Sequence, residues 1–74
     1  MKMTEQVRNL LSVLLESELE FKVLPSDNTV KVGNYTITYR PDVSDFSLRH
    51  KYTHIGTYSN AIELVTDILK GSDL

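Results

Sequence analysis

The side chains best suited to holding a ligand lie between residues 40 and 58 of this 74-residue chain. Cations, a histidine and tyrosines form this candidate binding surface: Arg40, Arg49, Lys51, Tyr52, His54 and Tyr58. Cations interleaved with hydroxyls and aromatic rings can hold a phosphate backbone and stack bases. The solvent face of an ordinary antiparallel sheet carries similar residues. Nucleic-acid binding is therefore one of two functions that we consider; the other is binding of a protein partner.

The two histidines, His50 and His54, are the first residues to test as metal ligands. On a single strand, side chains four residues apart point the same way but lie about 13 Å from each other. One metal ion with bonds of about 2 Å cannot bridge that distance. The two rings converge only if the chain turns at Tyr52-Thr53. Since the chain also has no cysteine, we predict neither a metal site nor a cofactor.

The residues that could catalyse a reaction are scattered. A turn, a loop or a helix surface explains each of these carboxylates: Asp27, Asp42, Asp45, Glu63 and Asp67. Ser44 and Ser59 have no neighbouring His/Asp order of the kind that activates a nucleophile. The three glycines are far apart, so no glycine-rich phosphate loop is present. A chain this short also has little room for a substrate pocket, and we predict a protein that is not an enzyme.

Composition bounds the class of protein. A hydrophobic fraction of 41% and a charged fraction of 24% are typical of a globular chain rather than a disordered one. We expect one domain spanning residues 1–74. The longest apolar run near the N-terminus is Val13-Leu14-Leu15, far shorter than the roughly 20 residues of a membrane span. With no export signal and no cysteine, the expected location is cytoplasmic.

Charge is distributed unevenly. Residues 1–30 and 59–74 each carry a net charge of −2, whereas residues 31–58 carry +2. The predicted helices are therefore acidic and the predicted sheet is mildly basic.

Two amphipathic helices are expected. The first runs from Thr4, a helix-capping residue, to Ser17 or Leu19, and its apolar residues recur every three or four positions. The second begins at Ser59 or Asn60. Asn60 with Glu63 approaches a capping box, and Gly71 is expected to end the helix as a left-handed residue.

Between the helices the apolar period changes to two. Val30 and Val32 occupy even positions, whereas Tyr35, Ile37 and Tyr39 occupy odd ones. One continuous strand cannot change parity in this way. Gly33-Asn34 therefore forms either a two-residue hairpin, which pairs Val32 with Tyr35 and Val30 with Ile37, or a β-bulge. We prefer the hairpin.

A second loop is expected at residues 41–45, followed by an alternating run from Phe46 to Tyr52 or His54 that Gly56 interrupts. The predicted fold is α+β: an N-terminal helix, an antiparallel meander of three to four strands and a C-terminal helix. Both helices should pack on one face of the sheet, since each has one apolar side to bury.

The α-β-β-β-α order resembles the double-stranded-RNA-binding domain, in which two helices back a sheet. That family's second helix opens with a lysine-rich motif that grips phosphates, whereas residues 59–63 contain no lysine, so only the layout carries over. The segment 55–61, IGTYSNA, is also similar to the sheet-to-helix junction of AP2-type and integrase arm-binding DNA modules. A short, cysteine-free chain of this kind further resembles the small accessory proteins of bacteriophages and prophages, many of which bind a host protein.

Several apolar residues fit none of the predicted stripes: Met3, Leu24, Val43, Ile55, Tyr58 and Leu74. A contiguous group of them would form a surface for a partner or for a second copy of the chain. The leading hypothesis is therefore a non-enzymatic interaction or regulatory protein that binds a protein partner or itself. The alternative is a nucleic-acid-binding module that uses the basic sheet face.

Overall fold

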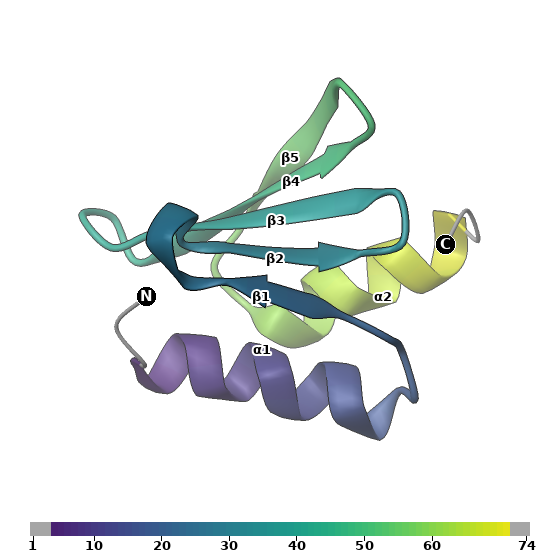
Figure 1. The fold of residues 1–74 in the computed structure, drawn as a ribbon, viewed down its shortest axis with the longest axis horizontal. Coiled ribbons are helices and arrows are strands. Elements are labelled where there is room, and N and C mark those ends of the chain that lie inside the picture. Colours follow the sequence, from purple (N-terminus) through teal and green to yellow (C-terminus); the bar gives the residue numbers. More distant parts are fainter. Residues whose placement is uncertain (1–3, 72–74) are drawn as a thin grey trace.

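In the computed structural model, which describes residues 4–71, two helices lie on the same side of a five-stranded antiparallel sheet (Figure 1). The helices and strands are α1 (Glu5–Glu16), β1 (Lys22–Leu24), β2 (Thr29–Val32), β3 (Tyr35–Arg40), β4 (Asp45–His50), β5 (Thr53–Tyr58) and α2 (Ala61–Gly71). A short 3-10 turn, Pro25–Asp27, joins β1 to β2. The strands lie in the sheet in chain order, so every connection is a hairpin. The predicted α+β meander between two helices is confirmed, with one strand more than expected.

Local hydrogen bonds begin and end α1. The hydroxyl of Thr4 accepts a hydrogen bond from the backbone N–H of Val7 at 3.3 Å, which confirms the predicted cap. At the other end, Glu18 adopts the left-handed conformation with φ 58°. The N–H groups of Glu18 and Leu19 then donate to the carbonyls of Leu15 and Leu14, each at 3.1 Å. This Schellman arrangement ends the helix without a glycine.

The N-terminus of α2 is capped by Asn60, as the sequence predicts. Its side-chain oxygen accepts from the N–H of Ile62 at 2.7 Å and from that of Glu63 at 3.4 Å. The expectation that Gly71 is left-handed is wrong, because Gly33 is the glycine with positive φ in the described part of the chain. Gly71 instead lies against β3, where a Cβ would collide with the hydroxyl of Tyr35. A larger residue here would force the Tyr35 side chain or the helix end to shift.

The hairpin at Gly33-Asn34 is confirmed. Val32 pairs with Tyr35 and Val30 with Ile37, the register that the change of parity predicts. Gly33 has φ 58°, a conformation that glycine adopts without steric cost. The turn therefore keeps the apolar residues of β2 and β3 on one face of the sheet.

A second hairpin, which the sequence analysis missed, separates β4 from β5 at Lys51-Tyr52. The single run predicted from Phe46 to Tyr52 or His54 is wrong, and Gly56 lies inside β5 rather than ending it. Opposite the Leu48–Arg49 step the register shifts, since Leu48 pairs with Gly56 and Arg49 with His54. Ile55 is the extra residue of this β-bulge.

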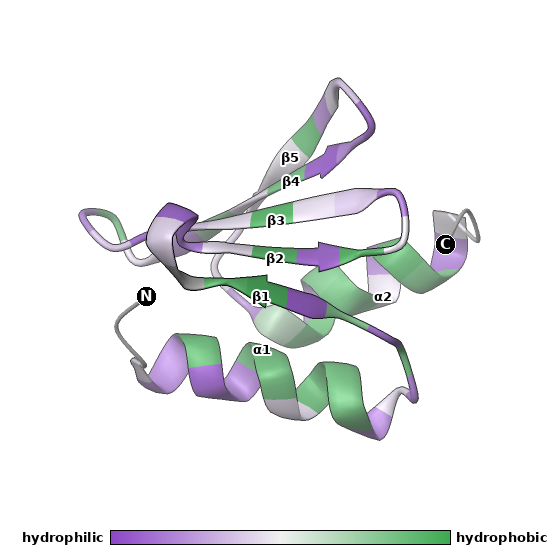
Figure 2. Cartoon of the chain, in the orientation of Figure 1, coloured by the Kyte–Doolittle hydropathy of each residue, from purple (hydrophilic) through white to green (hydrophobic). Residues whose placement is uncertain are grey.

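The core lies between the sheet and the helices. It is built from the inward face of the strands and one stripe of each helix (green in Figure 2). Its buried apolar side chains are Val7, Leu10, Leu14, Val30, Val32, Tyr35, Ile37, Tyr39, Phe46, Leu48, Ala61, Leu64, Val65 and Ile68. Within residues 4–71, neither helix covers the opposite face of the sheet (Figure 1).

Candidate functional site

The strand register aligns charged side chains in one row across the outer face of the sheet. Successive cross-strand partners from β1 to β5 form this row, here called the cation row: Lys22, Lys31, Thr36, Arg49 and His54. Hydrophilic segments of β1, β2 and β4 accordingly lie one above another toward the same end of the sheet in Figure 2. Adjacent strands lie about 4.8 Å apart, so the row extends roughly 19 Å.

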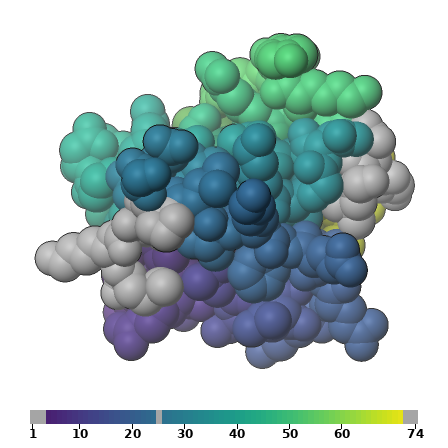
Figure 3. Space-filling model, viewed as in Figure 1, coloured from purple at the N-terminus to yellow at the C-terminus, as the bar shows by residue number. Residues whose placement is uncertain are grey.

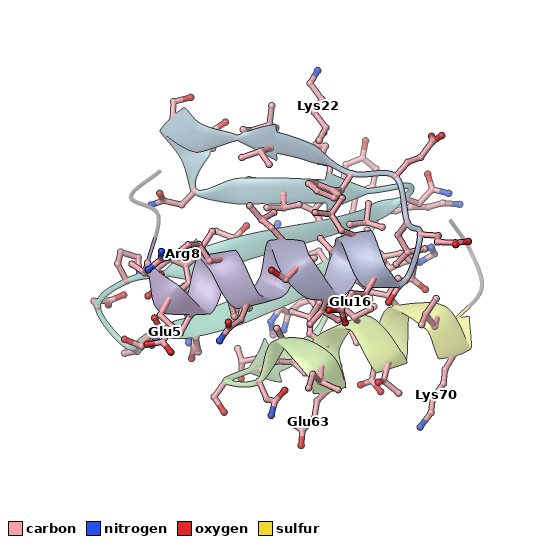
Figure 4. The ribbon with its side chains drawn as sticks, turned by 90° about the horizontal axis from the view of Figure 1, so that it is seen from below. Glu5, Arg8, Glu16, Lys22, Glu63 and Lys70 are labelled. Atoms are coloured by element: carbon pink, nitrogen blue, oxygen red, sulfur yellow. The ribbon has the colours of Figure 1, made fainter. Side chains whose placement is uncertain are left out.

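Alternation along each strand directs the cation row away from the core. Lys31 lies between the buried Val30 and Val32, and Arg49 follows the buried Leu48. Lys22 leaves β1 on the side opposite both helices (Figure 4). In Figure 3, side chains of the strands, coloured blue to green, form the surface above the purple α1. The cations of the row are therefore open to a ligand.

Within residues 4–71, no carboxylate is ion-paired with the cation row. Among residues 4–71, Lys22, Lys31, Arg49 and the nearby Lys51 form no ion pair. All four side chains are exposed. Cations gathered on one surface repel one another, and an anionic ligand relieves that repulsion. The arrangement is suited to binding several negative charges spaced along a line.

Arg40 lies away from the cation row, at the far end of β3. Its guanidinium donates two hydrogen bonds to Asp45, from Nε and Nη2, each at 2.7 Å. These hydrogen bonds lower the pKa of the Asp45 carboxyl and raise the pKa of Arg40. Because Asp45 already neutralises Arg40, this predicted site residue adds little to anion binding.

Tyr58 is also separate from the cation row. It pairs with Phe46 on the core side of the sheet and packs against the core. Its hydroxyl donates to the carboxylate of Asp67 at 2.6 Å, which connects β5 to α2. That hydrogen bond, with partial burial and the nearby negative charge, raises the pKa of Tyr58 to about 12. Its role is to hold the helix on the sheet.

Lys51 and Tyr52 adjoin the cation row at the β4–β5 turn. The N–H of Lys51 donates to the carbonyl of Asn34 at 2.9 Å, which brings this turn against the β2–β3 turn. Between the two turns lies an open hollow of about 410 Å³, lined by Lys31, Gly33, Asn34, Thr36, Lys51 and Tyr52. Tyr52 is 98% exposed. The structure thus brings together Arg49, Lys51, Tyr52 and His54 of the predicted surface.

The two histidines lie on different strands and face opposite ways. His50 is on the core side, with its ring centroid 4.8 Å from that of Tyr35. His54 pairs with Arg49 in the cation row. Within residues 4–71, no three His, Cys, Asp or Glu side chains are grouped so that they could hold a metal ion.

Lys22 and Lys31 lie outside the candidate surface predicted from the sequence. Lys22 alternates with Phe21 and Val23, and Lys31 alternates with two valines. This alternation predicts that both lysine side chains point away from the core. Their alignment with Arg49 cannot be predicted from the sequence, because it depends on how the four strands β1 to β4 pair.

The apolar residues that fit none of the predicted stripes differ in burial. Leu24 and Tyr58 are half-buried, Val43 and Ile55 are exposed, and Met3 and Leu74 lie outside the described residues. Ile62 and Leu69, 63% and 45% exposed, lie seven residues apart and hence on one flank of α2. Ile62 also lines a groove of about 410 Å³ between α2 and α1, together with Val13.

In the described part of the chain, neither helix is long and apolar enough to cross a membrane. Comparison with protein-family models, with curated proteins and with solved structures finds no match to this chain. The case for a function therefore depends on the geometry of the outer sheet face.

Proposed function

We propose that this chain is a non-enzymatic, cytoplasmic binding domain that holds nucleic acid on the outer face of its sheet. The observation that carries the proposal is the cation row, in which Lys22, Lys31 and Arg49 are aligned, exposed and not ion-paired within residues 4–71. Nucleic acids present regularly spaced phosphates, and cations that neutralise them release condensed counterions.

The distribution of charge over the molecule supports this choice of ligand. The net charge of the chain is −2, yet the labelled acids Glu5, Glu16 and Glu63 lie on the two helices, away from the outer face (Figure 4). A polyanion is thus attracted to the sheet and repelled from the helices, which orients the domain on its ligand.

Salt dependence of binding tests the proposal. We expect fluorescence anisotropy with labelled oligonucleotides to show binding at about 50 mM salt that weakens steeply at about 200 mM. Four phosphate contacts, through Lys22, Lys31, Arg49 and Lys51, give a slope of log K against log salt near −3 for a single strand. Absence of binding to single-stranded and duplex DNA and RNA at low salt would sink the proposal.

A second candidate function, self-association, is favoured by the exposed flank of α2. Ile62 and Leu69 present two large apolar side chains to solvent on one side of the helix, and a core this small gains stability from further burial. We expect sedimentation velocity to show a dimer that dissociates in Ile62→Lys, with Leu15→Lys on α1 as a matched control. A monomer over the whole accessible concentration range counts against self-association.

A further inference from the structure

The hollow between the β2–β3 and β4–β5 turns points to a finer assignment of the ligand. We infer that the domain binds single-stranded nucleic acid, with one base stacked on Tyr52 and the adjoining phosphates held by Lys31 and Lys51. This inference rests on the proposed function, because it takes the cation row as the path of the phosphate backbone.

Tyr52, at the tip of the β4–β5 turn, is placed to stack on an unpaired base. Its ring is 98% exposed, so it is left almost without contacts from its own chain. A tyrosine ring that packs against no other part of the chain does not help to stabilise the core. Stacking on an aromatic ring is, however, a principal way in which proteins hold an unpaired base.

The hollow beside Tyr52 has a volume of about 410 Å³ and is open to solvent, so an unpaired base can enter it from the surface. Lys31 and Lys51 supply charge for a phosphate, while the Thr36 hydroxyl is a group that can hydrogen-bond a base edge.

Duplex is disfavoured by the same geometry. Within a duplex, bases are stacked on one another and their faces are closed to a protein side chain, whereas unpaired bases can be splayed out. The cation row is also a single line of positive groups across the strands, suited to one backbone rather than two.

Titration of a labelled single strand of about a dozen nucleotides, as DNA and as RNA, tests the inference against a duplex of equal length. We expect the single strand to bind more tightly. Tyr52→Ala should weaken its binding about 5- to 100-fold, as expected for loss of one stacked base, without changing the salt slope. Tyr52→Phe, which keeps the ring, is the matched control and should bind within about twofold of the original chain.

The outcomes separate the two proposals. Because Tyr52 is almost fully exposed, both variants should keep the circular dichroism and thermal midpoint of the original chain. Equal affinity of Tyr52→Ala and the original chain, or tighter binding of duplex, overturns the single-strand assignment while salt-dependent binding still supports the cation row. Binding to none of the oligonucleotides overturns both.

Discussion

At the scale of single residues, the hydrogen bond from Tyr58 to Asp67 connects the last strand to the second helix at 2.6 Å. The raised pKa of Tyr58, about 12 against an ordinary 10, shows that the folded chain favours the neutral phenol. A group whose pKa is raised by folding stabilises the folded state below its unfolded pKa. That stabilisation is lost as the pH rises through the folded pKa.

We expect Tyr58→Phe to lower the free energy of unfolding by about 1 kcal/mol at neutral pH, since a partly exposed hydrogen bond is lost. The difference should stay constant up to about pH 10 and shrink between pH 10 and about 12, because the phenol ionises above pH 10 in the unfolded chain but only near pH 12 in the folded chain. Urea denaturation across this range measures it.

The control is Asp67→Asn, which keeps an acceptor but removes its charge. In this variant Tyr58 should ionise nearer pH 10, because the negative charge of Asp67 that raises its pKa is gone. A difference between Tyr58→Phe and the original chain that does not change with pH would contradict this account.

At the scale of elements, the contact between the end of α2 and β3 reverses the effect on stability that helix propensity alone predicts for replacing Gly71 with alanine. Replacing a helical glycine with alanine is ordinarily favourable by up to about 1 kcal/mol. At Gly71 the added Cβ would overlap the Tyr35 hydroxyl, and overpacking costs about 1–3 kcal/mol. We therefore expect Gly71→Ala to be destabilising in thermal or urea denaturation.

A double-mutant cycle isolates the contact. In a Tyr35→Phe background, which lacks the hydroxyl, Gly71→Ala should cost at least about 1 kcal/mol less than in the original chain. Equal costs in both backgrounds would show that the Tyr35 hydroxyl is not the obstacle.

The two hairpins show where element-scale prediction succeeds and where it fails. At Gly33-Asn34 the parity of apolar residues changes, so the turn is readable from the sequence. The two-residue turn at Lys51-Tyr52 also changes parity, but the β-bulge at Ile55 changes it back. Core-side positions are therefore even in β4 and even again at Gly56 and Tyr58, with only the short stretch between the turn and the bulge out of step, and the segment reads as one strand.

The turn at Lys51 also lacks turn chemistry. Lys51 adopts φ 56°, a conformation that glycine, asparagine or aspartate signals in a sequence and lysine does not. On the single strand predicted from the sequence, His50 and His54 share a face, whereas the hairpin turns them to opposite faces.

At the scale of the whole molecule, charge is sorted by face rather than by sequence segment alone. The acidic composition of the helices and the basic middle of the chain are readable from the sequence. The cation row is not, because it combines β1, β2, β4 and β5 through pairings that only the folded sheet defines. Arg40 shows the converse, since alternation predicts a free cation there, whereas Asp45 neutralises its charge.

The central claim is that the cation row, and not positive charge in general, holds nucleic acid. The most direct measurement compares the salt dependence of oligonucleotide binding for the original chain, Lys31→Gln and Arg40→Gln. Both variants lose one positive charge, but Lys31 lies in the cation row and Arg40 is paired with Asp45. We predict that Lys31→Gln reduces the steepness of log K against log salt by about 0.7, and that Arg40→Gln leaves it unchanged. Equal losses in the two variants would contradict the claim.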